Sequence, residues 1–478
     1  MTYQEQSHSS RREFLGQLGL AATGGMLAPL WLPGGSVSAA EQPAARPDGK
    51  SKSPGRRPRV AAVFTELRFR SHAYNILENF FQPYLFRGKL VDPGVDVVSF
   101  YADQFPENDM ARDVSKQLGV PLFDSIDKAL CVGGKDLAVD AVLSIGEHGD
   151  YPTNERGQKM YPRKRFFDEC VAVMERAGRY VPLFNDKHLS WRADWATEMY
   201  ETSVKHGFPL MAGSSVPLAE RVPPLDLPDG AEITEAVSIH GGGMEVYDFH
   251  ALEVLQSFVE SRAGGETGIE RVELLSGELY EAAVSEGRWS GSLVDAALKA
   301  ENIRGVERVK RPILGRPAYA QKEIARRPKG SHAIILTYRD GMQATILRLG
   351  SSANRWNFAC RVKGEKTPRA TALYNGPWGN RCLFKALSHS IQYMFQNNRQ
   401  PYPVERTLLV SNVLEAAMES HEKWGKPVSN ERLEVAYQPI DFTALRENGD
   451  SWKIITAESK QPADFSPGDA RFLPDGKD

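Results

Sequence analysis

The chain has 478 residues, of which 41% are hydrophobic and 25% are charged, and its formal net charge at pH 7 is −2. This length and composition favour a soluble globular protein of two or three domains. The sequence has no basic surplus and no basic stripe interleaved with aromatic residues, which argues against a nucleic-acid-binding protein.

The first 40 residues have the features of a twin-arginine signal peptide. Arg11 and Arg12 are followed by a weakly apolar run to Leu32 and by small residues around Ala39. This order of charged, apolar and small-residue regions is typical of a secretory signal. The run is shorter than the ~20 apolar residues of a membrane span and contains several glycines. We expect the twin-arginine machinery to export the folded protein to the periplasm or beyond, with no stable membrane span.

Residues 41–58 are rich in Pro, Gly, Lys and Arg and are predicted to form a flexible linker. From 59 to 217, short apolar runs then alternate with helical periodicity. The predicted strands are 59–64, 95–101, 138–145, 180–184 and 209–213, and the predicted helices are 71–86, 111–118, 126–131, 166–177 and 191–206. Alternation of this kind forms parallel βαβ units. It predicts a Rossmann-like α/β domain over residues 59–217.

The next part of the chain, residues 218–460, has a different texture. Longer alternating segments at 232–240, 269–277, 332–339 and 343–350 predict a large open antiparallel sheet, with a helix at 248–261 and closing helices at 383–397 and 404–424. We therefore expect an α+β domain for substrate binding and oligomerisation. Residues 461–478 contain three prolines and little periodicity, and are predicted to form a loose tail.

This order of parts resembles the Gfo/Idh/MocA oxidoreductases over about residues 59–428. The sequence from Phe384 to Arg406, followed by the helix around Ala416, resembles the family's closing helices, which pack back onto the first domain. Residues 138–148 resemble its fourth strand and the histidine-bearing loop after it, and residues 177–187 place Lys187 at the family's lysine position. The resemblance implies NAD or NADP as cofactor, a sugar or polyol substrate and a homo-oligomer.

The first turn of the Rossmann-like domain departs from the family. Thr65 to Ser71 contains no glycine, whereas glycines at this turn let the backbone approach a pyrophosphate. Arg68 and Arg70 are the candidates for holding phosphate by charge, although Glu66 places a carboxylate nearby. The other cofactor-binding candidates are Thr65, Glu147 and, for the ribose, Asp103.

The catalytic candidates are Lys187, His250, His148 and Asp248. Glu147 and His148 directly follow a buried strand, and ligands of open α/β sheets bind outside the carboxyl ends of the strands. Lys187 is a candidate general acid or carbonyl polariser with His188 as its partner. The family often has Asp and His four residues apart. Because Val246 stands four before His250, Asp248 or Glu245 would have to replace that aspartate.

Residues 240–250 allow three interpretations. His250 could exchange a proton with a substrate hydroxyl, or serve as a structural histidine. Alternatively, His240, Glu245 and His250 could hold zinc or manganese. Their spacing matches no standard metal motif, so we predict no metal site. Four further residues could stack on a sugar or belong to a core or lid: Trp356, Tyr374, Trp378 and Arg381.

The sequence thus favours an exported oxidoreductase that acts on a sugar or polyol with a tightly held nicotinamide cofactor. Two alternatives stay open. One is a cofactor-free descendant of the fold that binds, hydrolyses or eliminates a carbohydrate ligand, and the other is a non-catalytic secreted binding protein. The cysteines at 131, 170, 360 and 382 form no CxxC pair, which leaves both disulfides and buried free thiols open and disfavours a zinc-thiolate site.

Overall fold

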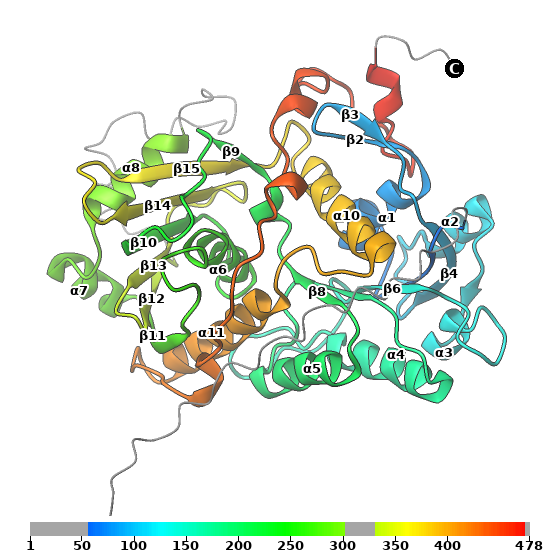
Figure 1. The fold of residues 1–478 in the computed structure, drawn as a ribbon, viewed down its shortest axis with the longest axis horizontal. Coiled ribbons are helices and arrows are strands. Elements are labelled where there is room, and N and C mark those ends of the chain that lie inside the picture. Colours follow the sequence, from blue (N-terminus) through cyan, green and yellow to red (C-terminus); the bar gives the residue numbers. More distant parts are fainter. Residues whose placement is uncertain (1–55, 302–329, 474–478) are drawn as a thin grey trace, which may run out of the picture. The chain divides into compact units, whose positions relative to one another are not determined.

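The computed structural model describes residues 56–301 and 330–473 (Figure 1). The predicted signal peptide and most of the predicted linker lie outside these residues. No helix within the two described ranges has both the length and the hydropathy to cross a membrane. All four cysteines are buried free thiols, so neither possible disulfide forms.

The first domain is built on six parallel strands: β1 (Arg59–Phe64), β4 (Asp96–Ala102), β5 (Leu122–Phe123), β6 (Ala141–Ile145), β7 (Leu183–Asp186) and β8 (Leu210–Gly213). Their order is β5-β4-β1-β6-β7-β8, and every neighbouring pair is parallel. β6 and β7 are buried along their whole length, as strands covered by helices on both faces must be. This is the Rossmann strand order with its switch point between β1 and β6, which confirms the predicted α/β domain.

Five helices cover this sheet: α1 (His72–Phe81), α2 (Ala111–Leu118), α3 (Ile126–Leu130), α4 (Arg163–Ala177) and α5 (Ala193–His206). Ser71 caps α1 by accepting a hydrogen bond from the backbone N–H of Tyr74. We predicted that this helix would continue to Phe86, but it ends at Phe81. Pro83 forces the residue before it out of the helical region, and the chain turns into the hairpin β2 (Tyr84–Phe86) and β3 (Lys89–Val91).

The second domain contains a seven-stranded open sheet: β9 (Glu220–Val222), β10 (Ile233–His240), β11 (Ile269–Ser276), β12 (His332–Tyr338), β13 (Gln343–Arg348), β14 (Trp356–Val362) and β15 (Arg369–Tyr374). The order is β11-β12-β13-β10-β14-β15-β9. The sheet is mixed, because β10 pairs in parallel with β13 while the other neighbours are antiparallel. α6 (Val246–Val259) packs on one face.

The other face of this sheet is also covered. Val237 and Ile239 of β10 belong to a cluster that contains Leu293 and Leu298 of α8 (Gly291–Glu301) and Tyr280 of α7 (Glu278–Glu286). The neighbouring Ala236 points instead into the core shared with α6. Because strand side chains alternate between faces, these two clusters lie on opposite sides of the sheet. A homo-oligomer built on this face would therefore have to pack against α7 and α8.

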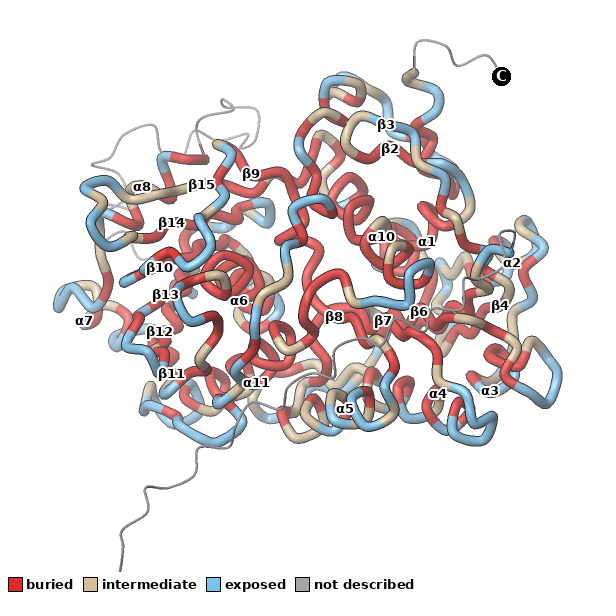
Figure 2. Tube along the Cα trace, viewed as in Figure 1, coloured by how far each residue is buried: buried red, intermediate tan, exposed pale blue. Residues whose placement is uncertain are grey.

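Two long helices close the fold. α10 (Asn380–Asn397) packs against α1, and α11 (Val404–Glu422) packs against α5 and α6. Figure 2 shows that both are largely buried, like the strands between them. The short 3-10 helices are η1 (Val216–Leu218), η3 (Glu431–Leu433), η4 (Thr443–Leu445), η5 (Asp450–Lys453) and η6 (Asp469–Phe472).

Residues 461–473 do not form the loose tail that we predicted. Asp469 is fully buried, pairs with Lys385 of α10 and accepts the backbone N–H of Leu85 at 2.6 Å. The backbone oxygen of Pro462 accepts from Arg381 at 2.8 Å. The described part of this segment is thus fixed to the first domain by buried charged hydrogen bonds, which low periodicity could not reveal.

Candidate functional site

Glu147 is the centre of a charged cluster at the carboxyl ends of β1, β6 and β7. Its backbone oxygen accepts the Thr65 hydroxyl at 2.6 Å, which joins the loops after β1 and β6. Its buried carboxylate lies 3.0 Å from Lys187 Nζ and also pairs with the guanidinium of Arg163 from α4. The structure therefore brings Glu147 and Lys187 together, with Glu147 as the counterion of the lysine.

The electrostatics of the cluster fix its protonation. Burial alone would raise the pKa of Glu147, but Lys187 and Arg163 outweigh burial and lower it below the ordinary value. Burial, assisted by the neighbouring His72, lowers the pKa of His148 to about 3. At neutral pH the cluster therefore contains an ionised carboxylate beside a neutral imidazole.

The loop after β7 connects this cluster to the second domain. Asp186 Oδ2 lies 2.7 Å from His72 Nδ1, and the backbone oxygen of Asp186 accepts from Arg163 Nε at 3.0 Å. His188 lies 3.5 Å from Arg163 Nη1 on one side and 3.6 Å from Glu245, at the start of α6, on the other. Burial lowers the pKa of His188. We predicted His188 as the partner of Lys187. The structure places its ring between Arg163 of the first domain and Glu245 of the second.

His250 reaches the same cluster from α6. Its Nδ1 lies 2.6 Å from the hydroxyl of Ser214, which follows β8. Burial, with Lys187 as the next cause, lowers the pKa of His250 well below its ordinary value, so the ring is neutral. Its ring packs edge-on against Trp356 at 5.4 Å and Tyr247 at 6.2 Å. Lys187 thus interacts electrostatically with both His250 and His148.

Asp248 does not join them. Its Oδ1 lies 2.9 Å from His240 Nε2 and 2.7 Å from His332 Nε2, and its Oδ2 accepts the backbone N–H of Glu245 at 2.8 Å. Both oxygens are engaged away from Lys187. Asp248 therefore does not replace the aspartate that the family places four residues before the histidine.

The β1–α1 turn is shaped by its own side chains. Glu66 pairs with Arg68, and Arg68 Nη2 lies 3.3 Å from His148 Nδ1. Arg70 is directed elsewhere, 3.6 Å from Glu78 and 3.2 Å from the backbone oxygen of Pro462. Arg68 and Arg70 thus already have partners and do not converge on one phosphate position.

Asp103, the candidate for the ribose, is also engaged. It accepts the hydroxyls of Tyr101 at 2.7 Å and Tyr151 at 2.5 Å, and it pairs with Arg165 at 2.6 Å. A dinucleotide would meet the buried carboxylate of Glu66 where its phosphates lie, at a turn without glycine. The residues of this arrangement do not fit a dinucleotide.

Backbone conformation marks the same loops. His148, Lys187 and Glu245 have φ values of 73°, 65° and 66°. Residues other than glycine rarely adopt positive φ, and the cost of order 1–3 kcal/mol per residue is tolerated where the surroundings enforce it, commonly at functional sites. Each of these residues also belongs to the charged network. Sequence reasoning could not detect this feature, because these residue types give no signal of left-handed backbone.

A cavity of about 590 Å³ is connected to the cluster through Tyr247, which lines the cavity and packs against the His250 ring. It is lined by Phe69 and Arg70 of the β1–α1 turn, Tyr247 of α6, and Trp378, with Asn75 contributing a fully buried side chain whose Oδ1 has no hydrogen-bond partner. Arg381, weighed from sequence, lines it too, whereas Asn75 and Tyr247 were missed. Aromatic faces with a few convergent amide and guanidinium groups suit a polyhydroxylated ligand.

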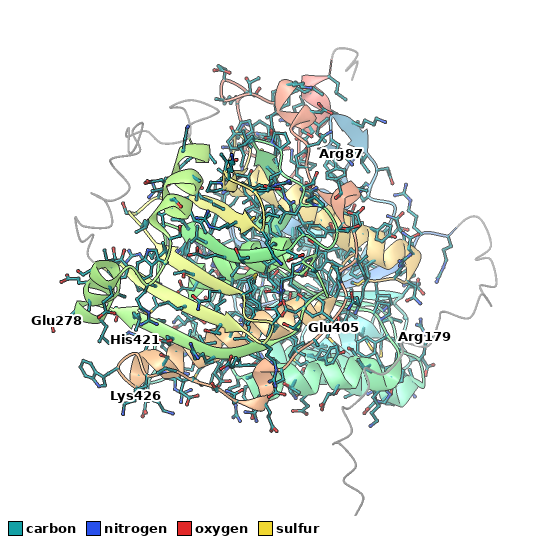
Figure 3. All side chains as sticks on the ribbon, turned by 60° about the vertical axis from the view of Figure 1, so that its left-hand side comes forward. Arg87, Arg179, Glu278, Glu405, His421 and Lys426 are labelled. Carbon is teal, nitrogen blue, oxygen red and sulfur yellow. The ribbon has the colours of Figure 1, made fainter. Side chains whose placement is uncertain are left out.

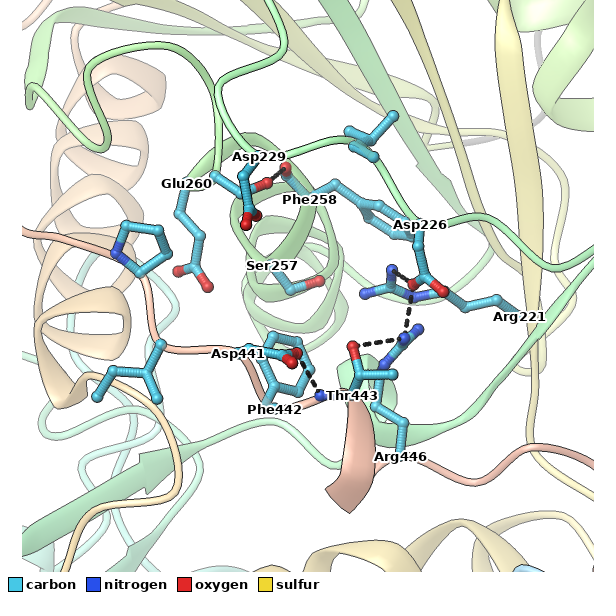
Figure 4. A pocket seen from close by; sticks show the side chains of 14 residues that line it. Arg221, Asp226, Asp229, Ser257, Phe258, Glu260, Asp441, Phe442, Thr443 and Arg446 are labelled. Atoms are coloured by element: carbon cyan, nitrogen blue, oxygen red, sulfur yellow. Dashed lines mark hydrogen bonds and ion pairs between the residues drawn. The ribbon is translucent and has the colours of Figure 1, made fainter.

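A second cavity, of about 340 Å³, lies between α6 and residues 439–446 (Figure 4). Arg221 and Arg446 both bind Asp226, at 3.2 Å and 2.6 Å, so both guanidinium groups already have a partner within the wall. None of the residues predicted from sequence to be functional lines this cavity. The first cavity is therefore the better candidate for a ligand.

Comparison with known proteins supports the fold. GenD2 from gentamicin A biosynthesis, solved in complex with NAD, has a TM-score of 0.50 at 12% identity, over 80% of this chain and 98% of GenD2. Scyllo-inositol dehydrogenase from Lactobacillus casei gives 0.47 at 13% (78% of this chain, 99% of that one), and myo-inositol dehydrogenase from Corynebacterium glutamicum gives 0.47 at 13% (78% and 98%). No protein-family model and no curated protein matches the sequence. The resemblance to the Gfo/Idh/MocA oxidoreductases is confirmed at the level of the fold.

Proposed function

We propose that the protein is an enzyme that transfers protons at a sugar-like or polyol-like substrate, with Lys187 and His250 as the proton-transferring groups. The observation that carries this proposal is the buried Lys187–Glu147 pair next to the neutral imidazole of His250. General acid–base catalysis needs one group that holds a proton and one that can accept it, at the same point. These residues supply that combination beside a cavity suited to a polyhydroxylated ligand.

In this proposal each residue has a separate task. The Lys187 ammonium, with Glu147 as its counterion at 3.0 Å, donates a proton to the leaving oxygen as the C–O bond breaks. His250 accepts a proton at Nε2, from the attacking water in a hydrolysis or from a substrate C–H in an elimination, when its Nδ1–H donates to the Ser214 hydroxyl. Tyr247 lines the cavity and packs against the His250 ring, so in this proposal its side chain moves aside for the substrate to reach His250 and Lys187. Neutral His148, held by Arg68, orients the opposite edge of the substrate.

We further propose that this chemistry runs without a dinucleotide, as an elimination or hydrolysis of the carbohydrate ligand. The support is the β1–α1 turn, where Glu66, Arg68 and His148 are bonded to one another in the position where phosphates would lie. Breaking those contacts would leave the Glu66 carboxylate facing a pyrophosphate, and two negative charges at that distance repel.

The second candidate is the nicotinamide-dependent oxidoreductase favoured by the sequence. It is supported by the Rossmann strand order and by the likeness in fold to GenD2, a protein solved with NAD. NAD and NADP are equally open under this candidate. It requires the β1–α1 turn to rearrange before the cofactor could bind.

One experiment separates the two candidates. The exported, purified protein is denatured, and the released small molecules are analysed by mass spectrometry. We expect no nicotinamide dinucleotide, together with a rise in melting temperature when sugars, polyols and sugar acids are added without NAD. Lys187→Met and His250→Gln should each lower the turnover of a stabilising ligand by ~10²-fold or more. Stoichiometric NAD or NADP would overturn the cofactor-free proposal and establish the second candidate.

We also propose that the protein acts outside the cytoplasm after twin-arginine export, on the strength of Arg11 and Arg12 and the weakly apolar run after them. The test is a fusion of residues 1–40 to a reporter that is active only if it folds in the cytoplasm. The residues should direct this reporter to the periplasm. Arg11→Lys combined with Arg12→Lys should retain it inside the cell. Equal export of both fusions would contradict the proposal.

A further inference from the structure

A cluster of metal-ligand residues lies in the second domain, outside the Lys187 site. His240 is the last residue of β10, His332 is the first of β12, and Asp248 lies in the first turn of α6. All three side chains are fully buried. His240 Nε2, His332 Nε2 and one Asp248 oxygen lie within 4.8 Å of one another. Two sheet strands and a helix terminus thus aim three ligand atoms at one point.

The contacts of His332 direct one of its ring nitrogens at this point. His332 Nδ1 lies 3.2 Å from the backbone oxygen of Gly330. A carbonyl oxygen only accepts, so Nδ1 carries the proton of this hydrogen bond. The other ring nitrogen, Nε2, lies 2.7 Å from the Asp248 carboxylate. His332 Nε2, His240 Nε2 and Asp248 Oδ1 therefore face one another, as the ligands of a single ion do.

The surroundings of the ligands match those of metal sites. A metal-binding histidine usually donates its other ring N–H to a carbonyl or carboxylate, and a metal-binding carboxylate is itself hydrogen-bonded. His332 donates to Gly330, and the second oxygen of Asp248 accepts from the backbone of Glu245 at 2.8 Å. Two imidazoles and one carboxylate are a donor set that suits zinc, iron and manganese.

We propose that His240, Asp248 and His332 bind one divalent first-row transition-metal ion. His240 must give up one interaction for this, the 3.3 Å hydrogen bond that its Nδ1 accepts from the backbone of Gly242. That bond lies in a run of three glycines, residues 241–243, whose backbone can adjust. The ion would fix the start of α6 to β10 and β12, and so hold His250, two residues after Asp248, in position.

The ligand set differs from the one that the sequence suggested. Glu245 faces His188, and His250 binds Ser214, so neither is available to an ion held by His240. His332 replaces them from a position 84 residues away from Asp248 in the chain. No local motif could have indicated this ligand, because the antiparallel pairing of β12 with β13, and the parallel pairing of β13 with β10, bring it into place.

Metal analysis of the full chain, purified without a chelator and with any affinity tag removed, tests the proposal. We expect about one equivalent of zinc, iron or manganese per chain by inductively coupled plasma mass spectrometry. Dialysis against a chelator should lower the melting temperature, and the same metal should restore it. Asp248→Asn and His332→Gln should each lower the bound metal at least tenfold. His421→Gln, at an exposed histidine of α11 (Figure 3), should retain it.

The wild-type chain alone can overturn the proposal, whether or not the variants fold. If it contains no metal, and if zinc, iron and manganese added after chelation neither bind nor raise the melting temperature, a proton and not a metal occupies the cluster. This result is independent of the dinucleotide analysis, so the metal site and the proposed function can fail separately.

Discussion

Replacing Glu147 by glutamine should destabilise the fold by about 3 kcal/mol at neutral pH. Both of its cationic partners are buried, with side-chain exposures of 1% for Arg163 and 6% for Lys187. Removing one member of such a group leaves charges in a poorly solvated place, which costs ~3–5 kcal/mol. Glutamine keeps the shape and one acceptor oxygen, so we expect the lower end of this range.

The assay is urea unfolding at pH 7, followed by tryptophan fluorescence and repeated by circular dichroism to check that both probes agree. Glu422→Gln is the matched control, because Glu422 pairs with Arg156 at 2.8 Å but is half exposed. Such surface pairs contribute under ~1 kcal/mol. If Glu147→Gln unfolds at the same urea concentration as Glu422→Gln, the cluster does not hold a buried ion pair.

The pH dependence gives an independent check of the same residue. The folded-state pKa of Glu147 lies below its ordinary value of 4.5, so its stabilisation is present above that value and is lost as the pH falls through the folded pKa. The stability difference between the wild type and Glu147→Gln should therefore be constant from about pH 6 to 8 and should shrink below about pH 4. A difference that grows on acidification would mean that the carboxyl is protonated in the fold.

Three further predictions concern other parts of the molecule. A Cβ on Gly242 would lie 1.9 Å from the Tyr247 ring, so Gly242→Ala should lower the free energy of unfolding by about 1–3 kcal/mol and weaken ligand binding in the first cavity. The control is Gly243→Ala, because a Cβ there has no atom within 4 Å. This control should change neither the melting temperature nor the ligand affinity. Burial raises the pKa of Glu253 to about 7, so the stability that its protonated form gives to the fold is lost as the pH rises through that value. Between pH 5 and 8 the wild type should lose about 1–3 kcal/mol of unfolding free energy relative to Glu253→Gln. If the unfolding free energies of the two proteins change equally with pH, the prediction is wrong. Deletion of residues 461–478 should lower the melting temperature by several degrees because it removes a buried ion pair with α10, and an unchanged melting temperature would show that the segment is dispensable.

The topology was readable from sequence because it depends on periodicity and order. Short apolar runs that alternate with amphipathic segments are compatible with few folds other than a parallel sheet covered by helices. The observed strand order confirmed the Rossmann-like domain. The prediction missed β14 and β15, although they are as long as β12 and β13, and it also missed α7 and α8. It took the sheet as antiparallel, because hydrophobic alternation is the same for the parallel pairing of β10 with β13.

The site was predicted in part, for a related reason. Residues that follow neighbouring parallel strands must meet at one edge, so Glu147 and Lys187 could be placed together in advance. The direction of a side chain on a helix is harder to read. Asp248 and His250 are two residues apart on α6 and therefore point to different sides, one to His332 and the other to Ser214. Arg70 also contacts Gln461 and Pro462, which come from a chain segment that no local pattern relates to it.

The charged cluster also restricts what kind of ligand could enter. Its carboxylates and cations are already paired within the protein, so an apolar ligand would remove water from them without offering hydrogen bonds in return. A polyol presents hydroxyls that both donate and accept hydrogen bonds, and these can substitute for water at the amide and guanidinium groups that line the cavity. The strained backbone at His148 and Lys187 holds their side chains in place before the ligand arrives, which lowers the ordering cost of binding. In the β1–α1 turn, Glu66 and Arg68 already bind each other, so a ligand that presents only hydroxyls needs no rearrangement there.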